Sequence, residues 1–239
     1  AVFERTQEAL KQAGLITHAE MFSRLAEKAA TLPHQPFDFV VVDEAQDVSI
    51  SQLKFLAAVS TSRGQVRPNS LFFAGDLGQR IFQQPFSWKS LGVDIRGRSR
   101  TLHINYRTSH QIRAQADQLL GPDVTDVDGN SEDRRGTVSV FNGPAPDIRS
   151  FKSEVAECKA VTAWILDRAK DGLAQHELGV FVRSDAQIPR AVAAVTAAGI
   201  PFNVLDEHVE TTNGQASVCT MHLAKGLEFR AVVVMACDD

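Results

Sequence analysis

Residues 39–47 read Phe39-Val40-Val41-Val42-Asp43-Glu44-Ala45-Gln46-Asp47, an apolar run that ends in two adjacent acids. A short aliphatic run of this kind predicts a strand that is buried on both faces, as in a parallel sheet covered by helices. Asp43 and Glu44 then follow the carboxyl end of the strand, the edge at which open α/β sheets bind ligands. Two carboxylates there can hold Mg²⁺ and orient a water molecule against the terminal phosphate of a nucleotide. From this stretch alone, the two acids can equally be caps of the following helix.

The composition indicates a soluble globular protein with one large or two ordinary domains. Its 239 residues are 44% hydrophobic and 23% charged. No apolar stretch approaches the length that crosses a bilayer, so no membrane contact is expected. Cys158, Cys219 and Cys237 form no CxxC pair, which disfavours a zinc site or a disulfide framework and fits a reducing cytoplasm. The net charge of -4 restricts any nucleic-acid site to a local groove.

Apolar periodicity and turn residues predict an alternation of strands and helices. A strand, a helix and a strand with polar residues at both strand ends form the βαβ arrangement of a parallel sheet. The sequence therefore predicts the α/β class, with two lobes that meet near residue 100. The expected strands are 37–42, 71–74, 101–104, 137–141, 178–182, 201–205, 217–220 and 231–235, and the expected helices are 17–30, 51–59, 109–120, 152–170 and 186–198.

Capping residues mark the ends of several of these helices. Thr17 and Glu20 form a capping box, in which side chains satisfy the unpaired first amides of the helix 17–30. Gly199 closes the helix 186–198, because glycine readily adopts the left-handed conformation that ends a helix.

The segment 109–136 is expected to contain one helix and one loop. Thr108 is expected to cap the helix 109–120. Residues 121–136 are rich in Asp, Gly, Asn and Arg and are expected to form a solvated loop. The buried stripe of the helix is expected to consist of Ile112, Ala116, Leu119 and Leu120.

Three further segments carry polar side chains close to predicted strands. The turn Gly75-Asp76-Leu77-Gly78-Gln79-Arg80-Ile81-Phe82 has a polar side chain that can reach a γ-phosphate. In Asn105-Tyr106-Arg107, an aromatic face suited to stacking on a purine precedes a guanidinium suited to phosphate. A hydroxyl, an imidazole, a cation and a carboxylate surround a glycine turn in Thr220-Met221-His222-Leu223-Ala224-Lys225-Gly226-Leu227-Glu228-Phe229.

Four motifs of this chain, in their order, resemble motifs II to V of the UvrD/Rep-type superfamily 1 DNA helicases. They are VVVDEAQD, GDLGQRIF, NYRT and TMHLAKGLEF. The resemblance spans residues 37–235. It implies two RecA-like parallel-sheet domains of the P-loop NTPase type, both incomplete. Residues 1–100 would be the C-terminal part of the first domain, with Walker B and motif III, and residues 101–239 the second domain. It also implies ATP in the cleft between the domains, Mg²⁺ as the metal, and single-stranded DNA crossing above.

The resemblance implies roles for the residues of the nucleotide site. Asp43 would coordinate Mg²⁺, and Glu44 would activate the attacking water. Gln79 would sense the γ-phosphate and couple it to the DNA path, while Tyr106 would stack on adenine. Arg107 would reach the γ-phosphate from the second domain, where an arginine can contribute about 10³–10⁵ in rate.

The remaining matched residues would lie near the ribose and the DNA. Glu228, in the turn that contains Gly226, would lie near the ribose of the nucleotide. Thr220 and His222 would contact the DNA backbone. Phe82 would be a platform for base stacking, which contributes about 1–3 kcal/mol per base.

Several of these roles have a structural alternative. Gln79 and Glu228 can be loop residues that are bonded to backbone amides. His222 can be an ordinary surface or core histidine, and Phe82, which follows a buried strand, can belong to the core.

The chain departs from the family pattern in two places. The family normally carries a tryptophan just after the position matched by Phe82, and Gln84 stands there instead. Trp88, a few residues downstream, can substitute as a DNA-stacking residue. The family also has a large accessory subdomain before the Thr220 motif, but residues 206–216 fill that interval and are too few for a domain.

The sequence contains no GxxxxGK[ST] loop, whose backbone amides and lysine hold nucleotide phosphates. The family's final arginine motif is absent as well. We therefore expect an internal fragment of an ATP-dependent DNA helicase or translocase of 3′ to 5′ polarity, inactive by itself. The alternative is a non-catalytic module that binds nucleic acid or a protein partner and carries idle motifs. The presence of Asp43, Glu44, Gln79 and Arg107 argues against that alternative.

Overall fold

The apolar runs around residues 40 and 72 form a parallel pair of strands in the computed structural model. β1 (Val40–Val42) lies beside β4 (Leu71–Phe73), and each residue of one strand is in register with its counterpart in the other. The parallel pairing that the sequence predicts is therefore confirmed.

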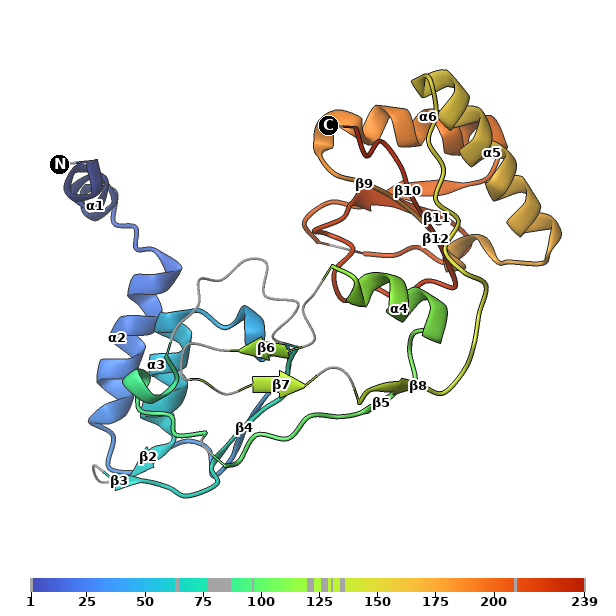
Figure 1. Ribbon diagram of the computed structural model, residues 1–239. Helices are drawn as coiled ribbons and strands as arrows, with labels where there is room; N and C mark the ends of the chain where they lie inside the picture. Colours follow the sequence, from blue (N-terminus) through green and yellow to red (C-terminus); the bar gives the residue numbers. More distant parts are fainter. Residues whose placement is uncertain are drawn as a thin grey trace. The chain divides into compact units, whose positions relative to one another are not determined.

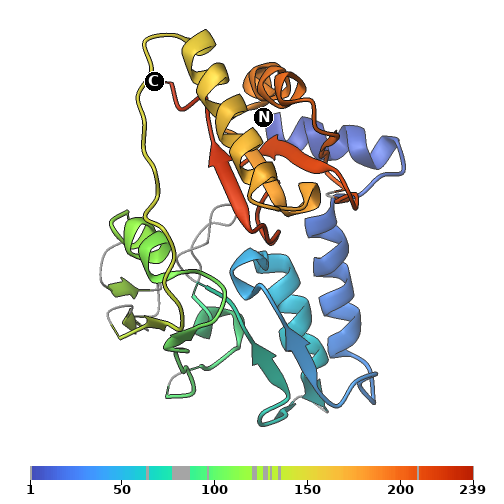
Figure 2. The ribbon, with the colours of Figure 1, turned by 90° about the vertical axis from the view of Figure 1, so that its right-hand side faces the viewer.

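Contacts within the chain group its residues into two units, 1–146 and 147–239 (Figures 1 and 2). The structure describes residues 2–62, 65–76, 87–95, 97–119, 123–125, 129, 131–133, 136–208 and 210–238. The domains expected from the sequence, 1–100 and 101–239, stay a prediction. No helix among the described residues has both the length and the apolar character needed to span a membrane.

The first unit begins with two helices and continues with short strands, helices and single helical turns. Its helices are α1 (Val2–Gln12), α2 (His18–Ala30), α3 (Ile50–Val59) and α4 (His110–Asp117), with 3₁₀ turns η1 (Ala45–Asp47) and η3 (Lys89–Leu91). Its remaining strands are β2 (Thr61–Ser62), β3 (Gln65–Val66), β5 (Ile104–Asn105), β6 (Asp123–Thr125), β7 (Ser131–Asp133) and β8 (Val138–Ser139).

One face of the β1–β4 pair packs against α3. Leu53 of α3 is fully buried and joins a core that includes Ala45, Trp88 and Val93. The other face is open within the described residues, because Val41 is 72% exposed and Phe72 is 63% exposed. Side chains alternate between the two faces of a strand, so only every second residue points toward α3. The expectation of a strand buried on both faces is therefore wrong for the described part of this unit.

The capping prediction holds in part at α2 and fails at α4. The Thr17 side chain accepts a hydrogen bond from the backbone N–H of Glu20 at 3.1 Å, as expected, but the Glu20 carboxylate pairs with Arg24, so the bond shown at this end is the Thr17 half of the expected capping box. At α4 the cap is Ser109, one residue later than predicted, whose hydroxyl accepts from the N–H of Ile112.

The apolar stripe expected for α4 is wrong. Ile112 is 50% exposed, Leu119 is 89% exposed and Ala116 is exposed, while Leu120 lies outside the described residues. The contacts of α4 are polar instead: the Arg113 guanidinium donates to the carbonyl of Thr137 and pairs with Asp117. Hydrogen bonds and an ion pair, rather than apolar burial, therefore hold this helix against the β8 segment.

The segment 121–136, expected to be a loop, contains strands. β6 and β7 pair in antiparallel, with Val124 opposite Glu132. Two β-branched residues in β6 favour an extended backbone. Gly129 between the strands has φ of +80°, which glycine adopts without strain.

The second unit is a four-stranded sheet in which every strand pair is parallel. The strand order is β10 (Phe202–Val204), β11 (Ala216–Thr220), β9 (Leu178–Val182) and β12 (Ala231–Val234). The helices α5 (Glu154–Lys170) and α6 (Ile188–Ala198) lie side by side over one face, as Figures 1 and 2 show. Short 3₁₀ turns, η4 (Gln175–Glu177) and η5 (Asp185–Gln187), precede β9 and α6.

Both faces of the central strands β9 and β11 are covered, as expected for a parallel sheet, whereas Val232 and Val234 of the edge strand β12 are 43% and 46% exposed. On the helical side, Ile165 of α5 and Val195 of α6 pack with Val180 of β9, and each is nearly or fully buried. On the other side, Phe181 and Cys219 contact the apolar residues of the segment 223–229. The α/β class with parallel sheets is therefore confirmed.

Candidate functional site

The carboxyl ends of β1 and β4 bring two predicted motifs to one edge. Asp43 and Glu44 follow β1, and Gly75 and Asp76 follow β4. Backbone hydrogen bonds continue past the strand ends, since the N–H of Ala45 donates to the carbonyl of residue 74 at 2.8 Å. This continuation holds the two turns side by side.

The two acids at this edge are exposed and do not cap a helix. Glu44 precedes η1, but its side chain makes no capping hydrogen bond. The next α-helix, α3, is capped by Ser49 and Gln52 in a reciprocal capping box. The alternative reading of Asp43 and Glu44 as helix caps is therefore wrong.

The backbone of Glu44 has an uncommon conformation. Its φ of 52° and ψ of 42° lie in the left-handed region, which few residues other than glycine adopt. The Oδ1 atom of Asp43 accepts a hydrogen bond from the N–H of Glu44 at 2.9 Å. Backbone strain of this kind concentrates at functional sites, where surrounding contacts maintain it.

Gln46 connects the two turns, and the sequence analysis gave it no role. Its side chain is 2% exposed. The amide nitrogen donates to the Glu44 carboxylate, and the amide oxygen accepts from the N–H of Asp76 at 3.0 Å. The sequence contained no sign that Gln46 is buried, because its neighbours in the motif are acids. The one available signal was its position, two residues after Glu44.

Two residues predicted for this site, Gln79 and Phe82, lie outside the described residues. Trp88 is described, and it is 5% exposed. Its ring packs on Phe73 at a centroid distance of 5.0 Å and an interplanar angle of 60°. Because the ring lies in the core, it offers no face to a base, and the expected DNA-stacking role of Trp88 is not supported.

The Asn105-Tyr106-Arg107 motif forms a turn after β5. The Asn105 side-chain oxygen accepts from the N–H groups of Arg107 at 2.9 Å and Thr108 at 3.1 Å. This local bonding fixes the backbone and leaves Tyr106 72% exposed. Arg107 is also exposed. The turn thus presents an aromatic ring and a guanidinium next to each other.

The last predicted motif follows β11 in the second unit. Thr220 ends the strand and is 1% exposed, whereas His222 is exposed. The Thr220 hydroxyl lies 3.5 Å from the Nε2 atom of His222. Gly226 has φ of +84°, and the exposed Glu228 follows two residues later. All four residues therefore belong to one segment at the carboxyl edge of the sheet.

Apolar contacts anchor this segment to the sheet. Phe229 packs on Phe181 of β9, with ring centroids 5.5 Å apart and an interplanar angle of 68°. Leu223 and Leu227 pack on the same cluster, which contains Cys219. Polar residues of the motif are thus carried on a turn whose apolar residues face the sheet.

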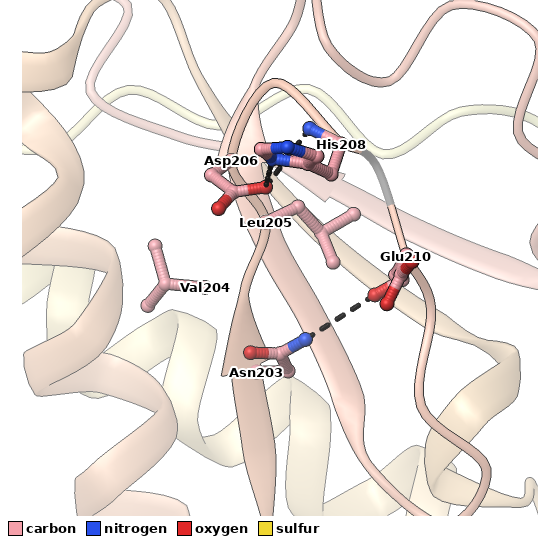
Figure 3. A pocket seen from close by; sticks show the side chains of 6 residues that line it. All are labelled: Asn203, Val204, Leu205, Asp206, His208 and Glu210. Atoms are coloured by element: carbon pink, nitrogen blue, oxygen red, sulfur yellow. Dashed lines mark hydrogen bonds and ion pairs between the residues drawn. The ribbon is translucent and has the colours of Figure 1, made fainter.

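A separate pocket lies at the carboxyl end of β10, with a cavity volume of about 270 Å³ (Figure 3). None of the predicted site residues lines it. Asp206 accepts a hydrogen bond from the N–H of His208, and this bond lowers the pKa of the Asp206 carboxyl. The lining residues are Asn203, Val204, Leu205, Asp206, His208 and Glu210. Two acids in the lining make the pocket a poor receptor for phosphate.

Comparisons with known proteins agree with the motifs. Residues 3–88 match the UvrD/REP helicase N-terminal domain. DNA helicase II of Haemophilus influenzae is 26% identical over 220 residues, which cover 85% of this chain and 28% of the relative. The resemblance to UvrD/Rep-type helicases is confirmed.

Further UvrD-type relatives give the same result. DNA helicase II of Escherichia coli is 25% identical over 218 residues, 85% of this chain and 28% of the relative. The ATP-dependent DNA helicase UvrD2 of Mycobacterium bovis is 27% identical over 169 residues, 69% of this chain and 23% of the relative. The chain thus spans about 28% of the length of the DNA helicase II relatives that it matches.

Proposed function

We propose that this chain is part of an ATP-dependent DNA helicase or translocase, which couples ATP hydrolysis to movement on single-stranded DNA in the 3′ to 5′ direction. The observation that carries the proposal is the edge formed by β1 and β4. There Asp43 and Glu44 are exposed, do not serve as helix caps, and adjoin the turn that opens the Gln79 motif. The names of the relatives, DNA helicase II and ATP-dependent DNA helicase UvrD2, support the same activity.

The acids at this edge suit a magnesium ion that is shared with a nucleotide. Mg²⁺ is usually held by one or two carboxylates together with phosphate oxygens and water, rather than by a complete protein cage. Asp43 would hold the ion, which would supply charge neutralisation at the phosphates. Glu44 would take a proton from the attacking water.

The other matched residues would bind the nucleotide. The exposed ring of Tyr106 would stack on adenine, and Arg107 and Gln79 would act on the γ-phosphate. Glu228, close to the Gly226 turn, would lie near the ribose. The Asn105 side chain accepts hydrogen bonds from the backbone that carries Tyr106 and Arg107 and so fixes it. This supports the proposal that both residues act on the same nucleotide.

DNA would be held by a few local contacts, because the chain carries a net charge of -4. The exposed His222 imidazole would donate to a backbone phosphate. Thr220 is 1% exposed, so the expected direct contact of its hydroxyl with DNA is not supported; the hydroxyl lies 3.5 Å from Nε2 of His222 and would act through that ring. Phe82 would stack on a base.

The test is DNA-stimulated ATP hydrolysis by the full-length protein. Glu44→Gln is expected to lower kcat about 10²-fold or more, because a neutral amide cannot accept the proton of the attacking water. Binding of single-stranded DNA is expected to persist. Glu27→Gln, the same chemical change at an exposed position of α2, is the matched control and should leave turnover intact. Normal turnover in Glu44→Gln would remove Glu44 from its role.

A second candidate function is a non-catalytic module that binds nucleic acid or a protein. The lack of a GxxxxGK[ST] loop in the 239 residues favours it, and for the same reason the isolated chain is expected to be inactive as an ATPase. A GK[ST] loop upstream in the full-length protein supports the enzyme, and its absence there supports the module.

A further inference from the structure

We infer that Gln46 is a positioning residue, which holds the Glu44 carboxylate in place and ties it to the turn after β4. This inference rests on the proposed function of Glu44 as the group that activates water. Gln46 itself is 2% exposed and bonds to the Glu44 carboxylate, so it acts through Glu44.

The hydrogen bonds of Gln46 determine how its amide is oriented. The N–H of Asp76 can only donate, so the atom that faces it at 3.0 Å must be the amide oxygen. An ionised carboxylate can only accept, so the atom that bonds to Glu44 must be the amide nitrogen. In this orientation both ends of the Gln46 amide are hydrogen-bonded. In the reversed orientation the amide NH₂ would face the N–H of Asp76, and the amide oxygen would face the Glu44 carboxylate.

Gly75 leaves the space that this arrangement needs. A Cβ atom at position 75 would lie 2.4 Å from the side-chain oxygen of Gln46 and 3.0 Å from the backbone nitrogen of Ala45. The 2.4 Å contact is shorter than real Cβ atoms make, so any other residue at position 75 would displace the Gln46 amide. The glycine is required here for close approach of the two turns.

The bond from Gln46 matters because Glu44 is exposed and could adopt several rotamers. A hydrogen bond to a charged group selects one rotamer and so fixes the carboxylate relative to the water that it activates. The Asp76 amide also belongs to the turn that leads into the Gln79 motif. Movement of that turn would therefore shift Glu44 through Gln46.

The test measures kcat and KM for ATP in steady-state ATP hydrolysis by the full-length protein with single-stranded DNA. Gln46→Glu keeps the oxygen that accepts from Asp76 but places a second carboxylate against Glu44. We expect kcat at pH 7 to fall about 10–100-fold while KM for ATP changes less than about twofold. The second carboxylate repels that of Glu44 instead of donating to it, so the rotamer selected by the Gln46 bond is lost, whereas KM for ATP is kept because Gln46 is buried and acts only through Glu44.

Two further variants complete the design. Gln52→Glu is the matched control, because Gln52 acts in the capping box of α3 and a glutamate preserves that box. It should leave kcat and KM for ATP unchanged. Gln46→Met keeps the volume but makes no hydrogen bond, so it should lower kcat by less than Gln46→Glu and also leave KM for ATP within about twofold. If Gln46→Glu does not fold, as judged by thermal unfolding, Gln46→Met tests the proposal by itself.

The outcomes separate this inference from the proposed function. If Gln46→Glu and Gln46→Met match the Gln52→Glu control in kcat, or if they raise KM for ATP as much as they lower kcat, the positioning role is overturned, although Glu44→Gln can still be inactive. If Glu44→Gln retains normal turnover, the proposed function fails first.

Discussion

Cys219 is fully buried in β11, directly before Thr220, and it is surrounded by apolar side chains such as Phe181 and Leu205. Burial disfavours the charged thiolate and raises the pKa of the Cys219 thiol from its ordinary 9.0 to about 11. The folded state therefore keeps this proton at a pH where the unfolded chain has lost it. Its contribution to stability is fully present below pH 9 and is lost as the pH rises through 11.

We accordingly expect the free energy of unfolding to fall between pH 9 and 11 by up to about 2–3 kcal/mol from this residue. Urea unfolding of the wild type and of Cys219→Ala across this range measures the contribution, because the variant should show a shallower fall. Cys237→Ala is the control, since Cys237 is exposed and free, and it should keep the wild-type slope. Equal slopes in the wild type and both variants would contradict the expected effect of burial.

The burial of Trp88 and of Gln46 could not be predicted from the local sequence. The aromatic ring of Trp88 suits a base platform, but whether it faces solvent depends on α3 and Phe73, which the local sequence does not reveal. Gln46 is polar yet buried, because Glu44 and Asp76 satisfy it from two different turns. Long-range partners determine both positions.

Elements buried on both faces were predicted best. β9 has the expected bounds, and Gly199 ends α6 with φ of 68° as expected. Continuous apolar runs and a closing glycine are local signals that tertiary packing reinforces. α4 lacks such reinforcement, because its contacts run through Arg113 rather than through an apolar stripe. The β1 edge of the candidate site was predicted from its apolar run and the acids that follow it, although Val41 of β1 is 72% exposed. Gln79 and Phe82 lie outside the described residues.

An ion cluster connects α5 and α6 to the segment after β12. The Arg190 guanidinium is 12% exposed and pairs with Glu157, also 12% exposed, and with Asp238. Burial opposes its charge, but the hydrogen bond to Asp238 and the nearby carboxylates prevail and raise the pKa of Arg190. Glu157 also accepts a hydrogen bond from the N–H of Ala236 at 2.9 Å. The carboxylate thus bonds to two elements at once.

Glu157→Ala is expected to destabilise the protein by about 3 kcal/mol, because it leaves a largely buried guanidinium with fewer partners and an amide without its acceptor. Glu154→Ala is the matched control: Glu154 lies 3.8 Å from Arg190 but is 74% exposed, so its loss should cost less than about 1 kcal/mol. Urea unfolding measures both values. If both variants lose the same free energy of unfolding, the burial of Glu157 does not make its contact with Arg190 stronger than that of Glu154.

The two units have separate apolar cores. In the second unit the core gathers residues of α5, α6 and the central strands β9 and β11. In the first unit it gathers Leu53 of α3 with Ala45, Trp88 and Val93. The two clusters have no residue in common, so the loss of packing in one removes no contact from the other. This separation predicts that each core stabilises its own unit.

Hydrogen exchange followed by mass spectrometry tests this prediction with one truncation in each core. Leu53 is 0% exposed and Ile165 is 1% exposed, so Leu53→Ala and Ile165→Ala should each cost about 2–5 kcal/mol within their own unit. Leu53→Ala should raise exchange in α3 and β1, while β9 and β11 keep their protection, and Ile165→Ala should give the reverse pattern. Leu166→Ala, next to Ile165 but 39% exposed, controls for helix propensity in α5 and should change exchange little. If either core truncation raises hydrogen exchange in both units, the two cores unfold together. Residues 1–146 and 147–239 would then form one cooperative structure.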